Sequence, residues 1–328
     1  MGRIAANRAE MNAFLRGSVL TFVHISFRTF PSMSRLSLFL PLSALVATLV
    51  ACVPLSHAAD AKAPDKGAPS TNKAPEVSVF LDKRLEDAVR QQVFAKRYTN
   101  SPLTAADVAN VSTFNGNGKG ITNLTGLEHC KALAAVDLAG NAIADLSPLK
   151  GLKQLQYLNL ATNKLKTIAP LATLPALQYI EISQNQVADL APIGGLTNLA
   201  SLYAGHNRIK SAGSLTNLPR LVSVHLEFNQ IGSISGFQNL RGVGSLSLSH
   251  NQVTDVSPLT GLRAPTYLFL DDNRIRDLAP LNSWITNDLA GAKNFAPFVN
   301  LYLHGNRFNA KTRQLLAEWK KGGVRVNE

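Results

Sequence analysis

YLNLATNKL, residues 157–165, is the stretch of sequence that decides the fold. Its frame, x-Φ-x-Φ-x-x-N-x-Φ with an apolar residue at each Φ, returns every 22 residues, as YIEISQNQV at 179–187 and SLSLSHNQV at 245–253 show. Repetition at one fixed spacing predicts a solenoid, in which each repeat is a unit stacked on the next. The asparagines of the frame are Asn141, Asn163, Asn185, Asn207, Asn229, Asn251, Asn273 and, after a spacing of 33 residues, Asn306. A weaker first copy, STFNGNGKGI, has Lys119 in the asparagine position.

Two apolar spacings within each unit predict its shape. Leu158 and Leu160 alternate with other residues, and alternate side chains of a strand point to the same face. The next apolar residues, Leu165, Ile168 and Leu171, recur every three positions, which fits 3₁₀-like turns better than an α-helix. Each unit is therefore predicted to be a coil with a strand on one side and a turn-rich return on the other. The column asparagine is expected to turn inward and to bond backbone groups of its own and the neighbouring coil, a structural role.

Five returns carry a proline after the turn, in the setting Asp-Leu-Ser-Pro-Leu or a close variant, where the extended chain needs no donor. These prolines are Pro148, Pro170, Pro192, Pro258 and Pro280. Together with the asparagine frame, they make residues 80–328 closely resemble the internalin-type bacterial leucine-rich repeats. The resemblance implies an α/β solenoid: a curved leucine-rich-repeat horseshoe of 22-residue coils over 111–308, with a parallel β-sheet on the concave face and small helical caps at both ends.

The N-terminal cap is predicted over residues 78–110. An open stack exposes apolar surface at its ends, so caps are required there. Leu81, Leu85, Ala88 and Val89 follow helical spacing, and the sequence TAAD that ends at residue 107 is typical of a helix start.

The C-terminal end is predicted to be closed by helices as well. Residues 282–300 interrupt the last repeat and are expected to contain a short helix. Residues 309–328 are predicted to form the C-terminal cap, as an amphipathic helix with Leu315, Leu316 and Trp319 on one face.

The first part of the chain is predicted to direct export. Residues 1–52 are assigned as an upstream extension and signal peptide, the signal proper being 33–52. There, a short basic segment precedes the apolar run LSLFLPLSALVATLVAC, which is too short for a comfortable transmembrane helix. Residues 1–32 are either an extension from an upstream start codon or a long basic region of the signal. Residues 53–77, rich in Ala, Pro and Lys, are predicted to be a disordered linker.

Two cleavage sites compete at the end of this signal. Leu49-Val50-Ala51-Cys52 resembles the bacterial lipobox, in which the cysteine becomes a lipid-carrying N-terminus; we favour it because Cys52 lies where the apolar run ends. Cleavage near Ser56-His57-Ala58 fits the small-x-small rule, and Cys52 would then be one more small apolar residue. In bacterial lipoproteins, Asp directly after the lipidated cysteine retains the protein at the inner membrane. Here Val53 follows Cys52, so the resemblance to the lipobox implies an outer-membrane destination. The chain is thus predicted to be a periplasmic or outer-membrane lipoprotein, or alternatively secreted.

Strand side chains that do not face the core line the predicted concave face. Counted back from each asparagine, these are positions −6, −4 and −2, and they include five of the six tyrosines. Aromatic residues favour strands in any case, but an outward-facing aromatic track also suits an interface or a sugar-stacking surface. The predicted partner-binding residues are Tyr157, Tyr179, Glu181, Tyr203, His225, Glu227, Tyr267, Phe269, Asp271 and Tyr302.

Charge and spacing argue against several other functions. The formal net charge is +12, but the basic residues do not form the stripe that is typical of nucleic-acid binders. Cys130 takes the place of Leu155 in the next repeat, so we expect it to be buried rather than a nucleophile. His206 and His250 are two coils apart, about 10 Å, which is too far to share a zinc ion easily. We therefore expect no metal site and no cofactor.

The leading hypothesis is an exported, non-enzymatic, monomeric recognition protein that binds a protein partner on the concave face. The alternative is a glycan- or peptidoglycan-binding protein of the cell envelope, in which the concave tyrosines stack on sugars. An enzyme is the third and least favoured hypothesis, because no nucleophile–base pair or ligand cluster satisfies the spacing. No nucleic-acid partner is expected, and membrane contact is expected only through a lipid anchor at Cys52.

Overall fold

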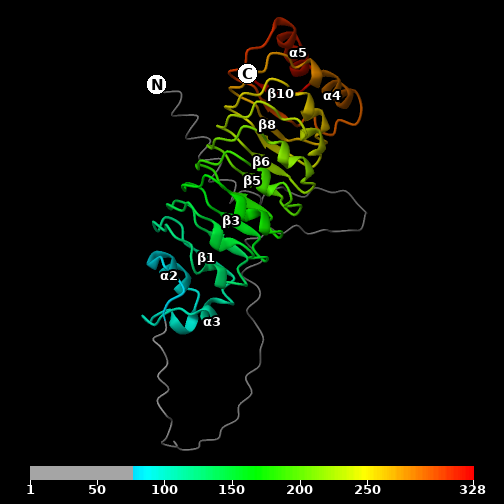
Figure 1. Cartoon of the computed structure of the whole chain (residues 1–328). Helices are drawn as coiled ribbons and strands as arrows, with labels where there is room; N and C mark the ends of the chain where they lie inside the picture. Colours follow the sequence, from blue (N-terminus) through cyan, green and yellow to red (C-terminus); the bar gives the residue numbers. More distant parts are fainter. Residues whose placement is uncertain (1–76) are drawn as a thin grey trace, which may run out of the picture. The chain divides into compact units, whose positions relative to one another are not determined.

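Each repeat folds into one coil, with a short strand on one side and in most coils a 3₁₀-helix on the other (Figure 1). The structure is a computed structural model, and it describes residues 77–328. The predicted signal peptide, the lipidation site Cys52 and all but the last residue of the predicted linker lie outside the described residues.

One parallel sheet runs through the whole stack. Its ten strands follow chain order without a crossover, which confirms the predicted solenoid. Within the repeats, Tyr157 is in register with Tyr179, and Leu158 is in register with Ile180. Equivalent repeat positions therefore form columns across the sheet. The strands are β1 (Thr113–Asn115), β2 (Ala135–Asp137), β3 (Tyr157–Asn159), β4 (Tyr179–Glu181), β5 (Ser201–Tyr203), β6 (Ser223–His225), β7 (Ser245–Ser247), β8 (Tyr267–Phe269), β9 (Asn300–Tyr302) and β10 (Arg325–Asn327).

The returns are short 3₁₀-helices, as the three-residue apolar spacing predicted. They are η2 (Leu127–His129), η3 (Ser147–Leu149), η4 (Ala169–Thr173), η5 (Ala191–Ile193), η6 (Gly213–Asn217), η7 (Phe237–Asn239) and η8 (Ser257–Gly261). In η3, η4, η5 and η8 a proline occupies the first turn, where its missing N–H leaves no bond unmade.

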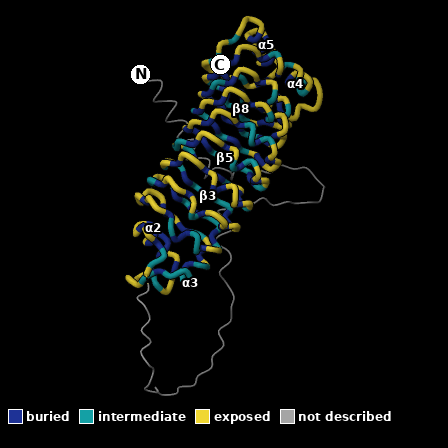
Figure 2. The backbone as a smooth tube through the Cα atoms, in the orientation of Figure 1, coloured by how far each residue is buried: buried dark blue, intermediate teal, exposed yellow. Residues whose placement is uncertain are grey.

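Columns of apolar side chains form the core of the solenoid. Figure 2 shows buried residues, in dark blue, recurring along the stack of coils. Leu158 and Leu160 from the strand, and Leu165 and Ile168 from the return, are each 0% exposed. Cys130 is equally buried, as predicted from its alignment with a leucine. Since every coil is covered by its neighbours, the core is continuous from one cap to the other.

Helix α2 (Lys83–Arg90) opens the N-terminal cap, and its start is decided by Asp82. The Asp82 carboxylate accepts a bond from the first turn of the helix and another from the backbone N–H of Thr122, at 2.8 Å, so it joins the helix to the first coil. The prediction that Leu81 lies on the buried face is wrong. Leu81 precedes the helix and is 72% exposed, whereas Phe80 is buried in its place.

The second cap helix, α3 (Ala105–Val108), begins as predicted. The Thr104 hydroxyl accepts a bond from the N–H of Asp107, and the Asp107 carboxylate accepts one from the N–H of Thr104 at 2.7 Å. Lys96, at the end of η1 (Phe94–Lys96), pairs with the same carboxylate at 2.7 Å. This ion pair ties α3 to the preceding loop.

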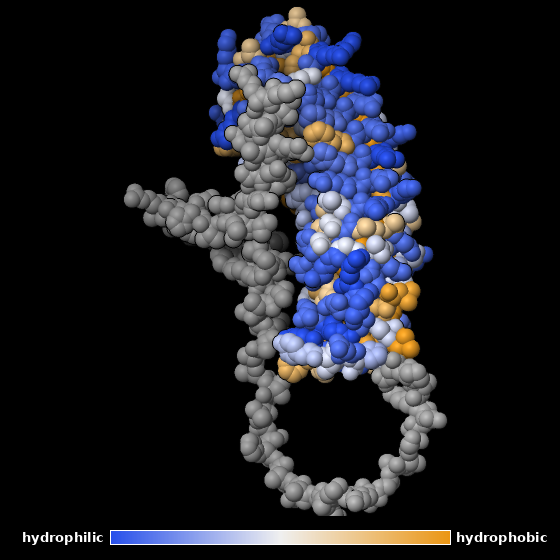
Figure 3. Space-filling model, turned by 90° about the vertical axis from the view of Figure 1, so that its left-hand side faces the viewer, coloured by the Kyte–Doolittle hydropathy of each residue, from blue (hydrophilic) through white to orange (hydrophobic). Residues whose placement is uncertain are grey.

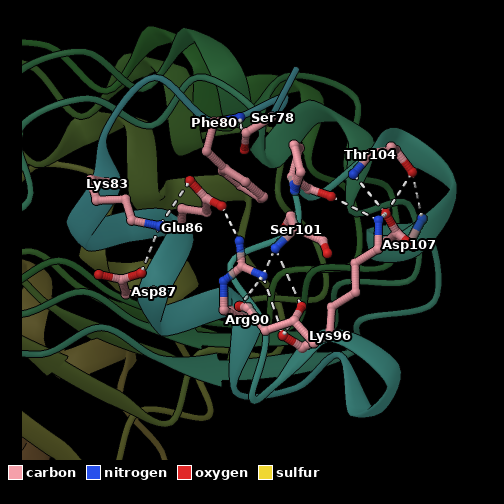
Figure 4. Close-up of polar contacts among 12 residues, drawn as sticks. Ser78, Phe80, Lys83, Glu86, Asp87, Arg90, Lys96, Ser101, Thr104 and Asp107 are labelled. Carbon is pink, nitrogen blue, oxygen red and sulfur yellow. Dashed lines mark hydrogen bonds and ion pairs between the residues drawn. The ribbon is translucent and has the colours of Figure 1, made fainter. Parts of the chain in front are cut away.

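Glu86 and Arg90 form a buried ion pair inside the cap (Figure 4). Arg90 also donates to the carbonyl oxygens of Lys96, Thr99 and Ser101, at 3.2, 3.1 and 2.8 Å. The guanidinium thereby holds the loop after α2 against the helix. Sequence analysis did not predict this pair, because nothing in the local pattern shows that both groups are buried.

Two helices and an additional strand close the other end. Helix α4 (Ala279–Ala290) lies between β8 and β9, in the predicted insert, and begins slightly before it. Helix α5 (Ala310–Lys321) buries its predicted apolar face, and its Trp319 indole N–H donates to Asn282 on α4 at 2.9 Å. The chain then pairs β10 with β9, a strand that sequence analysis did not predict. β10 covers an edge that β9 would otherwise expose.

The side of the solenoid that Figure 3 shows is mainly hydrophilic, with small and separate hydrophobic patches. Within residues 77–328, the large hydrophobic side chains that are exposed are Val77, Leu81, Phe94, Tyr98, Val222 and Phe298. None of the helices in this part of the chain is long and apolar enough to cross a membrane.

Candidate binding face

The column asparagines connect adjacent coils. The Asn207 amide donates to the carbonyl of Ile182 in the preceding coil at 2.9 Å, and to those of Ala204 and Gly205 in its own coil at 3.2 Å. Its Oδ1 accepts a bond from the N–H of Val187 in the preceding coil at 2.9 Å. The same set of bonds recurs at Asn163, for example. These amides satisfy backbone groups of the turn, so they are not free to bind a partner.

The residue before each column asparagine has a left-handed backbone, with φ near +55° at His206, Phe228 and His250. At this edge of the sheet the Phe228 ring stacks on His206 and His250, with ring centroids 4.1 and 4.0 Å apart. His250 also pairs with Asp272 at 3.3 Å. Sequence analysis compared the two histidines but missed the phenylalanine between them, although it occupies the same repeat position.

A row of stacked rings crosses the concave face over β3 to β6. Tyr157 and Tyr179 are 4.5 Å apart between centroids, Tyr179 and Tyr203 are 5.4 Å apart, and Tyr203 and His225 are 4.8 Å apart. The row begins in the −6 column and moves to the −4 column at β5. With two neighbouring acids it forms what we call the central cluster: Tyr157, Tyr179, Glu181, Tyr203, His225 and Glu227.

Stacking decides which parts of these rings a partner can reach. The first and last pairs are stacked face to face, at interplanar angles of 13° and 24°, whereas Tyr179 and Tyr203 are tilted by 37°. The ring edges and hydroxyls are therefore the parts offered to a partner. Burial raises the pKa of Tyr157, Tyr179 and Tyr203, and nearby carboxylates raise it further. Their phenols remain protonated at neutral pH and are able to donate and to accept hydrogen bonds.

Glu181 lies in the −4 column between two strands that carry tyrosines. Burial raises the pKa of its carboxyl to about 7, bonds from Ser183 partly oppose this, and the charge of Glu227 adds to it. One carboxylate oxygen accepts the backbone N–H of Ser183 at 2.8 Å. The side chain is thus half-buried among tyrosines and close to changing its charge at neutral pH.

Glu227 extends over Gly205, which lies in the coil between those of Glu181 and Glu227. A Cβ on Gly205 would lie 2.5 Å from Oε1 of Glu227, so the carboxylate occupies the space that any other residue would fill. The other oxygen, Oε2, is buried and has no hydrogen-bond partner. Sequence analysis missed Gly205, although it is the only glycine in the −2 column from β1 to β9 and precedes a long acid by one repeat.

His225 does not balance these two acids. Burial lowers its pKa below the usual 6.5, although the charge of Glu227 acts in the opposite direction. The imidazole is therefore neutral at pH 7, and its Nε2 lies 3.3 Å from the Ser245 hydroxyl. The central cluster thus combines two carboxylates with neutral tyrosines and a neutral histidine.

A second aromatic group lies over β8 and β9. The Phe269 ring stacks on Tyr302 at 4.6 Å and lies 6.0 Å from Tyr267. Burial raises the pKa of Asp271, although its carboxylate accepts bonds from the His304 N–H at 2.9 Å and from a serine hydroxyl at 3.2 Å. We call Tyr267, Phe269, Asp271 and Tyr302 the distal cluster.

Strand β7 separates the two clusters. Ser245, Ser247 and Ser249 occupy all three outward positions of its coil, and Ser247 and Ser249 are buried beneath their larger neighbours. The concave face therefore presents two aromatic areas rather than one continuous track. All ten side chains predicted to bind a partner fall in one area or the other.

The Cys130 thiol and the acidic and histidine side chains were the candidates for chemistry in the sequence. Burial raises the pKa of the Cys130 thiol to about 12, and the charge of Glu128 adds to this, so the thiolate that a nucleophile requires is absent at neutral pH. Within residues 77–328, no group of three or more His, Cys, Asp and Glu side chains is arranged to hold a metal ion.

Comparison with known proteins agrees with this geometry. The protein-family model for leucine rich repeats (2 copies) matches residues 131–173, 197–239 and 245–283. Internalin C2 from Listeria monocytogenes is 27% identical, with a TM-score of 0.60 over 73% of this chain and 100% of that chain. An internalin from the same organism, inlF, is 20% identical, with a TM-score of 0.55 over 77% of this chain and 92% of that chain. No curated protein matches the sequence. The chain therefore contains leucine-rich repeats and is similar to internalins, as the repeat frame predicted.

Proposed function

We propose that this internalin-like chain is an exported, non-enzymatic recognition protein that binds a protein partner on its concave face. Leucine-rich repeats commonly mediate recognition between proteins, and the fold is typically non-enzymatic. The observation that carries the proposal is the pair of aromatic clusters on a rigid sheet. Buried aromatic side chains dominate the binding energy of many interfaces, and a rigid framework loses little entropy on binding.

The dimensions of the sheet suit a protein partner. Ten strands at about 4.8 Å give a face roughly 43 Å long, enough for a standard interface. A sugar ring prefers to stack on an open aromatic face, whereas the Tyr157 and Tyr179 rings stack on each other and Tyr203 stacks on His225. This arrangement favours a protein partner over the glycan alternative.

The test is capture of partners from native envelope extract by the parent chain and by Tyr179→Ala/Tyr203→Ala. We expect the double variant to lose the captured protein. The matched control is Phe94→Ala/Tyr98→Ala, which removes two exposed aromatic side chains from the N-terminal cap and should change nothing. If the concave variant retains every partner, binding does not occur on this face. A peptidoglycan pulldown with the same variants tests the glycan alternative.

The anchor is a separate part of the proposal. Cys52, at the end of the predicted signal, is proposed to carry a lipid that holds the chain at the outer membrane. Cys52→Ala should then move the protein from the membrane fraction to the soluble fraction. Unchanged fractionation would exclude the lipid anchor and would favour cleavage near Ser56-His57-Ala58.

A further inference from the structure

The concave face has an unusual charge distribution for so basic a chain. The formal net charge of the chain is +12, yet no lysine or arginine occupies position −6, −4 or −2 in the coils of β1 to β9. Four of these positions are acidic: Asp137, Glu181, Glu227 and Asp271. From β1 to β9 the outward strand positions therefore supply no lysine or arginine, and Arg325, in register with Asn300, lies on β10 at the C-terminal end of the sheet.

One acid of the central cluster is incompletely satisfied. Oε2 of Glu227 is buried without a hydrogen-bond partner, and buried polar atoms without a partner are rare and costly. Glu181, in contrast, is bonded by the backbone N–H of Ser183 at 2.8 Å and by the Ser183 side chain. The neighbouring His225 is neutral at pH 7, so the histidine does not compensate the negative charge of the cluster.

We infer that the central cluster binds a cationic side chain, arginine or lysine, of the protein partner, with the carboxyl groups of Glu227 and Glu181 as its acceptors. This inference rests on the proposed function, because it assumes that the partner is a protein seated on the concave face. A guanidinium or ammonium group supplies both the missing donor and the missing charge. The hydroxyls of Tyr179 and Tyr203 are further acceptors beside the carboxylates.

The geometry favours an organic cation over a metal ion. Calcium takes six to eight oxygen ligands, whereas this cluster offers two carboxylates, and no metal-binding group of three is present in residues 77–328. Since the aromatic faces are covered by their neighbours, the cation is held mainly by hydrogen bonds to oxygens and less by contact with the rings.

Gly205 decides where the acceptor lies. Because a Cβ there would lie 2.5 Å from Oε1 of Glu227, the variant Gly205→Ala keeps both carboxylates but displaces one of them. The displaced group is the end of a flexible side chain, so the coil itself is expected to keep its fold. This variant tests whether binding depends on where the Glu227 carboxylate lies, because the carboxylate itself is retained.

The test is an NMR titration of the full-length chain with acetyl-Gly-Arg-Gly-amide and with the citrulline peptide, its neutral isostere. We expect saturable shifts at the central cluster with the arginine peptide and binding about tenfold weaker with citrulline. Glu227→Gln and Gly205→Ala should each weaken arginine binding by a similar factor. Glu318→Gln, which removes the same charge from the exposed face of α5, should have no effect.

Three results would overturn the inference: equal binding of the two peptides, arginine binding that Glu227→Gln does not change, or shifts confined to another surface. Thermal unfolding of Glu227→Gln gives a further check. Because Oε2 has no partner, the variant should melt no earlier than the parent, and an earlier transition would mean that Glu227 serves the fold.

The outcome is separable from that of the proposed function. A partner whose capture requires Tyr179 and Tyr203 but not Glu227 would leave the concave face as the binding face and refute the cation site. Capture that is independent of the tyrosines would refute the proposed function itself, whatever the arginine peptide does.

Discussion

Replacing Asn207 by alanine tests whether the asparagine column holds the coils together. The substitution leaves the buried N–H of Val187 without an acceptor, which costs about 1–3 kcal/mol. The three carbonyls that lose the amide, those of Ile182, Ala204 and Gly205, each keep a second donor, so each loss costs only about 0.5 kcal/mol. We therefore expect the free energy of unfolding to fall by about 3 kcal/mol.

The assay is guanidinium denaturation followed by far-UV circular dichroism and by tryptophan fluorescence. The circular dichroism signal reports the whole solenoid, whereas Trp284 and Trp319 report the C-terminal helices, so separate transitions would show that the broken coil uncouples the two ends. The control is Asn198→Ala, an exposed asparagine that bonds Pro175 and Arg220; it should change stability by less than about 0.5 kcal/mol. A loss below about 1 kcal/mol for Asn207→Ala would refute the reasoning.

Three further predictions concern buried ionisable groups. The pKa of Glu181 rises from 4.5 to about 7 on folding, so the folded chain holds a proton that the unfolded chain has lost, and stability falls as the pH rises through this range. In denaturation assays, Glu181→Gln should have the same stability as the parent near pH 4 and should be more stable at pH 8 by up to about 3 kcal/mol. In a Cys52→Ala variant, whose one cysteine is Cys130, the thiol should resist a reagent such as DTNB in the folded chain at pH 8 and react on unfolding; rapid labelling of the native variant would contradict the burial of Cys130. Glu86→Ala leaves the buried Arg90 charge without a counter-ion and should lower the free energy of unfolding by about 3–5 kcal/mol. Asp87→Ala, which breaks an exposed ion pair with Lys83, should lower it by less than about 1 kcal/mol, and similar losses in the two variants would argue against a buried pair.

Most of the fold could be predicted because repetition multiplies a weak local pattern. One coil with a three-residue strand carries little information, but the frame of YLNLATNKL recurs at a fixed spacing, and stacking equal coils leaves only one register. The buried positions, the 3₁₀ returns and the outward columns of the sheet all followed from that frame. The departures lie outside it: Leu81 proved exposed, and β10 was not predicted, because the caps follow no repeat.

The composition of the concave face was also visible in the sequence, since outward positions alternate with buried ones along each strand. Its arrangement was not. The tyrosine row changes column at β5, Glu227 lies across Gly205, and the β7 serines divide the aromatic side chains into two clusters.

The sequence by itself therefore determined the coil, its core and the list of residues on the concave face, because those depend on periodicity along one chain. Only the tertiary structure decided which side chains touch, which carboxylate oxygen lacks a partner and which acid has a raised pKa. The reason is that these properties depend on side-chain reach and burial across neighbouring coils, between residues about 22 or 46 positions apart, which no local pattern encodes.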